Sequence, residues 1–381
     1  MRAICKLLLL FFQITFTLHA QDVQVSLLNI GDASPPLRVN QWIKGTPIDK
    51  FEKGKVYVIE FWATWCKPCI AAMPHLSALA REYKDEVTVV GIDIYESKVM
   101  PVKSNKKVKA FVDSMGKRMD FNVAIEDSNF TVADWLVGAG EQNSGIPRTF
   151  VIDADGKLAW IGHPSELDEV LHKIVNGTWD IKDELNRRNE NRRLAILDDS
   201  LNYELIRFTR NNYNMNDTDR PDSALLMIDE IVRNEPNLKY APFIASHTFS
   251  ALLKTNTHKA FEYGKMAIVK PGYSGLCYDR IIGTIEVYRD KLNLPSEIYE
   301  LGAEAYQVEI DHIPYPEVVN MARLYYNMAE MYWYAKNKSK AIETMQKGIE
   351  TLKNRKVVSK RDVDAFEARL QQYKNMSYKI I

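Results

Sequence analysis

The chain has 381 residues, and its 50 basic side chains balance its 50 acidic ones. Hydrophobic residues make up 46% of the sequence and aromatic residues 10%, which is ordinary for a globular protein with enough length for two domains. Because there is no basic excess, the composition argues against a nucleic-acid partner.

Residues 1–20 have the order typical of a secretory signal peptide. Arg2 and Lys6 precede a short apolar run at 7–12, and a cleavage site is expected before Gln21. The run is too short to span a bilayer comfortably. We therefore expect a protein exported to the periplasm or another extracytoplasmic compartment, membrane-tethered if the segment is not cleaved.

Cysteine usage favours chemistry over structural cross-linking. Cleavage before Gln21 would leave three cysteines, Cys66, Cys69 and Cys277. An exported protein that depends on disulfides for stability usually carries an even and larger set. Cys277 is most simply interpreted as a buried small hydrophobic residue.

The segment from Glu60 to Cys69 reads EFWATWCKPC and is the most informative part of the chain. It follows a β-type run at 56–59 and leads into a segment with helical spacing of apolar residues. The pattern predicts a strand, a short loop and a helix that begins at the two cysteines.

This position explains the spacing of the cysteines. The unpaired amides and the dipole at a helix N-terminus lower the pKa of a thiol there, which favours Cys66 as the nucleophile. Lys67 adds a cation, and Pro68 suits the start of a helix. Cys69 lies one turn further along, where it can attack a mixed disulfide formed at Cys66.

A metal site and a structural disulfide are the alternative interpretations of the pair. Zinc usually needs four ligands, and the sequence has no second Cys/His pair at zinc spacing. A bridge that closes two intervening residues restricts the unfolded chain little. We expect a redox-active disulfide between Cys66 and Cys69, and no other cofactor.

The rest of the first half alternates strands and helices. Strands are expected at 56–61, 87–94, 122–125, in a segment that ends at 153, and at 157–162, and helices at 70–83, 106–115, 131–137 and 166–175. The first two strands and the helix between them form a βαβ unit, which implies parallel pairing, and Asp155-Gly156 predicts a hairpin turn. Residues 30–37 are expected to be irregular, with turns at 44–48 and 53–55.

Residues 26–177 resemble the thioredoxin superfamily, and within it the TlpA/ResA-like exported thiol-disulfide oxidoreductases. The resemblance rests on FWATWCKPC at 61–69, on Pro74, on Gly145-Ile146-Pro147 before a strand, and on FVIDADG at 150–156. It implies an α/β thioredoxin-like fold, with a central mixed sheet flanked by helices.

The resemblance also implies which residues bind substrate. Pro147 matches a cis-proline that lies against the redox pair in the family, and the backbone of the preceding residue, here Ile146, pairs with the client chain. Trp65, Lys67 and Pro68 adjoin Cys66 and are expected to contact the client as well.

Glu60 matches a buried acid of thioredoxin. A carboxyl group buried beneath Cys69 would have a raised pKa and would take the proton from that thiol as it attacks. The alternative is a charge exposed at the end of a strand. Because Glu60 lies between Ile59 and Phe61 in a run that should be central, we favour the proton-relay role.

From Thr178 the strand signals disappear. Residues 178–193 are strongly charged and are expected to form a linker or a solvated helix. Small residues such as Ala224, Ala260 and Ala329 then recur in helical segments of roughly tetratricopeptide length. We expect a degenerate TPR-like helical-repeat domain at 194–381, with an ordinary helical bundle as the alternative.

The sequence thus predicts a signal peptide at 1–20, a thioredoxin-like domain at 21–177, a charged linker or helix at 178–193 and an α-helical domain at 194–381. The expected partners are client proteins with thiols or disulfides, an upstream redox protein, and a protein bound by the helical domain. The rival functions are a protein-binding module with a vestigial thioredoxin scaffold and a thiol peroxidase.

Overall fold

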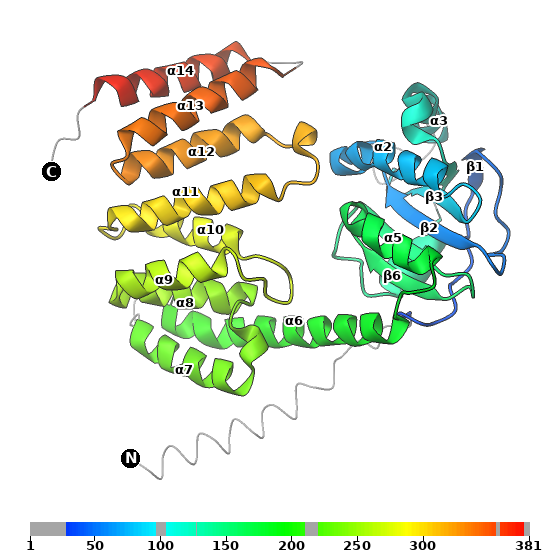
Figure 1. Ribbon diagram of the computed structural model, residues 1–381, viewed down its shortest axis with the longest axis horizontal. Coiled ribbons are helices and arrows are strands. Elements are labelled where there is room, and N and C mark those ends of the chain that lie inside the picture. Colours follow the sequence, from blue (N-terminus) through cyan, green and yellow to red (C-terminus); the bar gives the residue numbers. More distant parts are fainter. Residues whose placement is uncertain (1–27, 97–103, 127, 210–219, 356–358, 377–381) are drawn as a thin grey trace, which may run out of the picture. The chain divides into compact units, whose positions relative to one another are not determined.

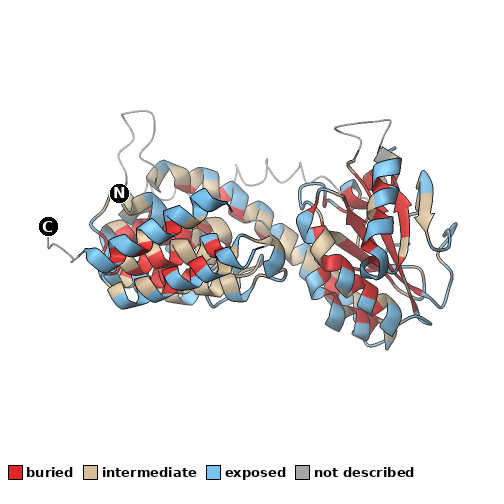
Figure 2. Ribbon diagram, turned by 90° about the horizontal axis from the view of Figure 1, so that it is seen from above, coloured by how far each residue is buried: buried red, intermediate tan, exposed pale blue. Residues whose placement is uncertain are grey.

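A computed structural model of the chain describes residues 28–96, 104–126, 128–209, 220–355 and 359–376. The chain divides into two compact units, the first ending at Leu185 and the second beginning at Asn186. Each unit has buried residues at its centre (Figure 2). The expected export segment at 1–20 lies outside the described residues.

The first unit is built on one six-stranded sheet (Figure 1). Its strands are β1 Gln41–Lys44, β2 Val56–Trp62, β3 Val87–Asp93, β4 Asn122–Ile125, β5 Arg148–Ile152 and β6 Leu158–Gly162. Their spatial order is β1-β4-β3-β2-β5-β6. The β2/β3 and β3/β4 pairs are parallel and the other three pairs antiparallel, which confirms the predicted mixed sheet.

Helices cover both faces of the sheet. Those of the first unit are α2 Lys67–Glu82, α3 Ser104–Met115, η1 Gly116–Met119, α4 Phe130–Val132, the π-helix η2 Ala133–Val137, η3 Pro164–Glu166 and α5 Leu167–Val175. Buried residues of α2, α3 and α5 form one core layer, and η2 contributes to the other. Both faces of the central strands are therefore covered, which explains why these strands are largely apolar.

The central strand β2 is buried along its whole length. Val58 and Trp62 belong to the core layer that also contains Cys66 and Cys69, whereas Ile59 belongs to the opposite layer. Since successive side chains of a strand point to opposite faces, Glu60 lies on the same face as the cysteines' core layer.

Two details of the first unit differ from the prediction. The short edge strand β1 was not predicted: it lies between the irregular segment expected at 30–37 and the turn expected at 44–48, and it pairs antiparallel with β4. The helix expected at 131–137 begins at Phe130 and widens into a π-helix from Ala133. An edge strand of four residues has too little alternation to be recognised without its partner.

The charged stretch at 178–193 lies mostly within one long helix, α6 Ile181–Thr209. This helix is partly buried, because Leu194 and Leu201 are only 3% and 4% exposed. No helix in the described part of the chain is both long and apolar enough to cross a membrane. The domain limits given above remain a prediction.

The second unit is all helical, as predicted. After α6 come α7 Pro221–Asn234, η4 Pro236–Leu238, α8 Pro242–Thr255, α9 Thr257–Ala267, α10 Tyr278–Tyr288, α11 Ser296–Asp311, η5 Pro316–Val318, α12 Met321–Tyr334, α13 Lys338–Lys353 and α14 Lys360–Asn375. Figure 1 shows α11, α12, α13 and α14 side by side in chain order.

Small residues lie where these helices meet. Ala224, Ala260, Ala329 and Ala341 are fully buried. Small side chains allow helix axes to approach closely, which is the packing expected of stacked helical hairpins. The assignment to a TPR-like repeat remains a prediction.

Two helical glycines of this unit allow a matched test of the packing. A Cβ added at Gly264 in α9 would collide with Leu301 and lie 3.1 Å from the Phe249 ring, whereas Gly283 in α10 faces open space. We expect Gly264→Ala to lower the free energy of unfolding by about 1 kcal/mol, because overpacking outweighs the gain in helix propensity. Gly283→Ala should not destabilise. Urea unfolding of both variants tests this, and equal stability would contradict it.

Candidate active site

Cys66 and Cys69 form a disulfide at the start of α2. Cys66 is the N-cap residue of the helix, and its Sγ accepts a hydrogen bond from the backbone N–H of Cys69 at 3.2 Å. The two residues are only 4% and 1% exposed. The structure therefore places the pair at a helix N-terminus, as the sequence predicts.

The residues expected to contact a client surround Cys66. Trp65 is 57% exposed, and Lys67 and Pro68 are also exposed. The carbonyl oxygen of Ile146 lies 3.6 Å from Cys66 Sγ, and the peptide bond between Ile146 and the buried Pro147 is cis. The exposed side chains and the Ile146 backbone thus meet at one end of the redox pair.

Glu60 lies in β2, next to the last residue pair between β2 and β5. It is 2% exposed, and it pairs with Gly91 of β3 on one side and with Thr149 of β5 on the other. Thr149 in turn pairs with Gly162 of β6. The immediate neighbours of Glu60 in this row are therefore small.

The two glycines of this row leave room for indole rings. A Cβ at Gly91 would lie 3.1 Å from Nε1 of Trp62, and a Cβ at Gly162 would collide with the Trp160 ring. Both rings belong to the same core layer as the cysteines. The indole rings thus pack over this face of the sheet, on which Glu60 is only 2% exposed.

This burial dominates the ionisation of Glu60. It raises the pKa of the Glu60 carboxyl to about 8, although the Thr149 hydroxyl and the charge of Arg148 both act to lower it. Thr149 Oγ1 donates a hydrogen bond to Glu60 Oε2, and Oε1 has no hydrogen-bond partner among the described residues. Glu60 is therefore suited to exchange a proton near neutral pH.

The sequence analysis missed a second buried acid, Asp93, at the end of β3. Asp93 is fully buried, pairs with Trp62 of β2, and has no hydrogen bond to either carboxyl oxygen from the residues described. Burial, and then the nearby charge of Glu96, raise its pKa to about 9, while Lys107 acts in the opposite direction. The sequence did offer one indication of this acid, because Asp93 is a charged residue in the predicted strand at 87–94.

Glu96 holds the loop that leads to the cysteines. Its side chain is 6% exposed, and its Oε1 accepts a hydrogen bond from the backbone N–H of Thr64 at 2.5 Å. Its Oε2 lies 3.3 Å from Nζ of Lys107 in α3. This contact too was not predicted, because it joins residues 32 positions apart in the sequence.

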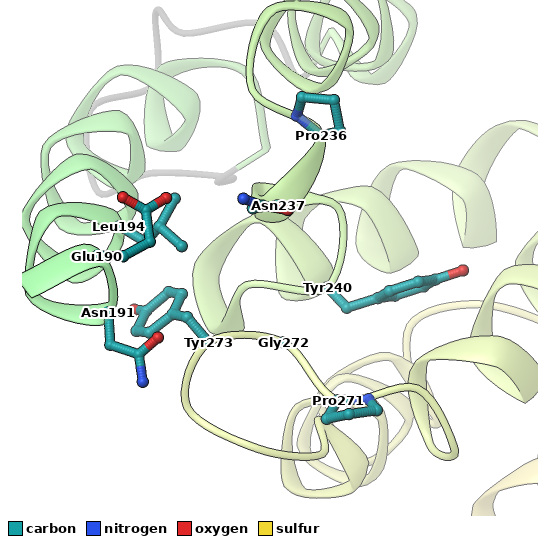
Figure 3. Close-up of a pocket in the computed structure, with 9 residues that line it drawn as sticks. All are labelled: Glu190, Asn191, Leu194, Pro236, Asn237, Tyr240, Pro271, Gly272 and Tyr273. Carbon is teal, nitrogen blue, oxygen red and sulfur yellow. The ribbon is translucent and has the colours of Figure 1, made fainter. Parts of the chain in front are cut away.

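The second unit carries a pocket but no redox pair. The pocket is lined by residues of α6, η4 and the loop after α9, namely Glu190, Asn191, Leu194, Pro236, Asn237, Tyr240, Pro271, Gly272 and Tyr273. Figure 3 shows Glu190 and Leu194 projecting from α6 toward Tyr273 and Asn237. Nothing in this lining forms a catalytic arrangement. Within the described residues, no group of three His, Cys, Asp or Glu side chains is placed to hold a metal ion.

A family model and several known proteins match part of this chain. A model of the AhpC/TSA family matches residues 30–161. Protein FixW of Rhizobium leguminosarum is 31% identical over 40% of this chain and 69% of its own length. Thiol-disulfide oxidoreductase ResA of Bacillus thuringiensis (strain Al Hakam) is 32% identical over 39% of this chain and 80% of its own. A solved thiol-disulfide isomerase from Corynebacterium glutamicum is 21% identical over 39% of this chain and 97% of its own, with a TM-score of 0.32.

The ionisation of Asp93 predicts how stability depends on pH. Asp93 keeps its proton in the folded chain up to about pH 9 but loses it near pH 4 when unfolded. The unfolded state therefore binds fewer protons in this range, so stability falls as pH rises through it, by at most about 1.4 kcal/mol per pH unit from this group. Asp93→Asn should lose less stability than the wild type between about pH 5 and about pH 8.

Urea unfolding at several pH values measures this difference. Asp85→Asn is the control, because Asp85 is an exposed acid of the same unit. Glu60 is unchanged in all three proteins and adds the same pH dependence to each. Parallel curves for Asp93→Asn and the wild type would contradict the assignment.

Proposed function

The chain is a thioredoxin-like thiol-disulfide oxidoreductase of the AhpC/TSA family, and we propose that Cys66 and Cys69 exchange dithiol and disulfide with client proteins outside the cytoplasm. The observation that carries the proposal is the disulfide at the N-terminus of α2, with the Ile146 carbonyl beside Cys66. The redox group is this disulfide itself.

The reduced pair would reduce a client disulfide in two steps. The Cys66 thiolate, favoured by the amides of the helix N-terminus, attacks one client sulfur and displaces the other as a thiolate. Cys69 then attacks Sγ of Cys66, so the intramolecular disulfide forms while the mixed disulfide breaks. The second client thiolate leaves, and the electron pair that reduces the client comes from the two cysteines. The reverse sequence oxidises a client.

We assign the proton of Cys69 to Glu60. Supporting this role, Glu60 lies on the same sheet face as the core layer of the cysteines and carries a raised pKa. An ionised Glu60 accepts the thiol proton as Cys69 becomes the nucleophile, and it returns the proton in the reverse direction.

We assign client contact to the exposed rim of the site. Trp65 offers an apolar side chain, Lys67 and Pro68 flank the attacking sulfur, and the backbone of Ile146 before Pro147 is available to pair with an extended client segment. Such pairing would depend on the backbone of the client rather than on a particular side chain, so several different client proteins could bind in the same way.

We further propose that the helical unit binds a protein partner that directs the enzyme to its clients. Support comes from the stacked helices and from large apolar side chains on its surface, among them Leu226, Tyr203 and Val287, which are 71%, 68% and 54% exposed. An upstream redox protein would restore the pair after each turnover.

Trapping tests the order of attack. In a Cys69→Ser variant the mixed disulfide at Cys66 cannot be resolved, so we expect client adducts to accumulate and to disappear on treatment with a reductant. Non-reducing electrophoresis followed by mass spectrometry identifies both the adducts and the linking cysteine. Cys66→Ser is the matched control and should form none. Adducts of equal abundance in the two variants would overturn the assigned roles.

Insulin reduction separates the rival functions. The oxidoreductase should turn over insulin with dithiothreitol as the electron source, and turnover should be lost in Cys66→Ser. A binding module with a vestigial scaffold predicts no turnover. A thiol peroxidase predicts peroxide consumption, but Ala63 stands where its usual Thr would precede Cys66 by three residues.

Export has its own test. We expect the chain produced in its native compartment to begin near Gln21, because the sequence before it has the charge and apolar order of a cleaved signal. N-terminal mass spectrometry of the isolated protein measures this. Replacing Leu8 and Leu9 by Asp should block processing and leave the full-length form in the cytoplasm. Equal processing of that variant would contradict a signal peptide.

A further inference from the structure

The buried acid Glu60 has one dedicated partner. Thr149 is fully buried and lies directly opposite Glu60 in the antiparallel pair of β2 and β5. Directly opposed residues on one face of such a pair have Cβ atoms only about 5 Å apart, which suits a hydroxyl and a carboxyl group. The Thr149 hydroxyl donates to Oε2 of Glu60.

The two carboxyl oxygens of Glu60 therefore have different environments. Oε2 is held by Thr149, while Oε1 is buried with no hydrogen bond from any residue that the structure describes. A buried oxygen without a partner costs free energy, most of all when the group is charged. Binding a proton at Oε1 would remove the buried negative charge.

The strand that supplies Thr149 also carries the expected client contacts. Ile146 and Pro147 come directly before β5, which begins at Arg148, and Thr149 is its second residue. Ile146 lies against Cys66 at the surface, and Thr149 lies against Glu60 in the interior. One short segment thus joins the attacking sulfur to the buried acid.

We propose that Thr149 is a positioning residue of the redox reaction, which fixes the Glu60 carboxyl group so that Oε1 is the oxygen that exchanges a proton with Cys69. This rests on the proton-relay role proposed for Glu60. When Cys69 resolves a mixed disulfide, its thiol proton moves to Oε1 and its sulfur forms the bond to Cys66. The Cys66–client bond breaks, and its electron pair leaves with the client thiolate, which takes a proton from water.

Thr149 also helps to set the pH at which Glu60 acts. Its hydrogen bond favours the ionised form, so its removal should raise the pKa of Glu60 above about 8. The other charged or titratable groups around Glu60 are Arg148 on β5, Asp93 on the same face of β3, and the cysteine pair at the start of α2. All of these remain in a Thr149 variant.

The test compares Thr149→Val, which keeps the shape of the side chain, with Thr149→Ser, which keeps the hydroxyl. The measured quantity is the rate at which Cys69 releases a small aromatic thiol from a mixed disulfide preformed at Cys66, as a function of pH. In Thr149→Val we expect the ionisation that controls this rate to move upward by about one pH unit and the rate at neutral pH to fall roughly tenfold. Thr149→Ser should restore the wild-type profile.

Glu60→Gln separates failure of this inference from failure of the relay itself. If Glu60 is the relay, the controlling ionisation disappears in Glu60→Gln, and Thr149→Val has no further effect in that background. If Glu60→Gln retains the ionisation, the relay role is wrong and the Thr149 assignment falls with it. If Glu60→Gln loses the ionisation while Thr149→Val keeps the wild-type profile, only the positioning role is wrong. If Thr149→Val lowers the rate equally at every pH without shifting the controlling ionisation, Thr149 has only a structural role. That result would also overturn the positioning role.

Discussion

The central strand β2 is the constraint on which the first unit depends. It pairs with β3 and β5, it is buried on both faces, and it ends at the loop that delivers Cys66 to the N-terminus of α2. Because β2 is paired on both sides and buried on both faces, it cannot shift its register. The loop and the helix that follow it are therefore held in place. The same enclosure forces its one acid, Glu60, out of water. The position of Cys66 and the burial of Glu60 thus both follow from this one packed strand.

Glu60 and Asp93, the two buried acids on the cysteine side of the sheet, have different surroundings. Burial raises the pKa of both carboxyl groups. The Thr149 hydroxyl and the charge of Arg148 oppose it at Glu60, whereas at Asp93 the nearby charge of Glu96 adds to it and only Lys107 opposes it. The pKa of Glu60 therefore lies nearer to neutral pH, and that of Asp93 lies higher. At neutral pH Asp93 adds no negative charge beside the site, so it does not oppose a thiolate at Cys66. An ionised acid at this position would disfavour that thiolate by Coulomb repulsion.

Local patterns were enough to predict most of the first unit and the redox pair. The apolar runs at 56–61 and 87–94, the hairpin turn at Asp155-Gly156 and the helix after Cys69 all depend on neighbours along the chain. What the sequence could not provide was non-local pairing. Which residue of β5 lies opposite Glu60 depends on the register of two strands almost 90 positions apart, so Thr149 could not be recognised as its partner. Strand β1 and the contact of Glu96 with Thr64 were missed for the same reason.

Cys277 shows that position at a helix N-terminus alone does not make a cysteine reactive. Like Cys66, it is an N-cap residue, preceding α10, and it is 1% exposed. Its side chain accepts no hydrogen bond from its helix, and its Sγ instead donates to the carbonyl oxygen of Tyr240 at 3.1 Å. Burial raises the pKa of the Cys277 thiol to about 12. Since the thiolate is the nucleophile, this thiol is inert at neutral pH. Cys66 Sγ, in contrast, accepts a hydrogen bond from a backbone N–H of its own helix.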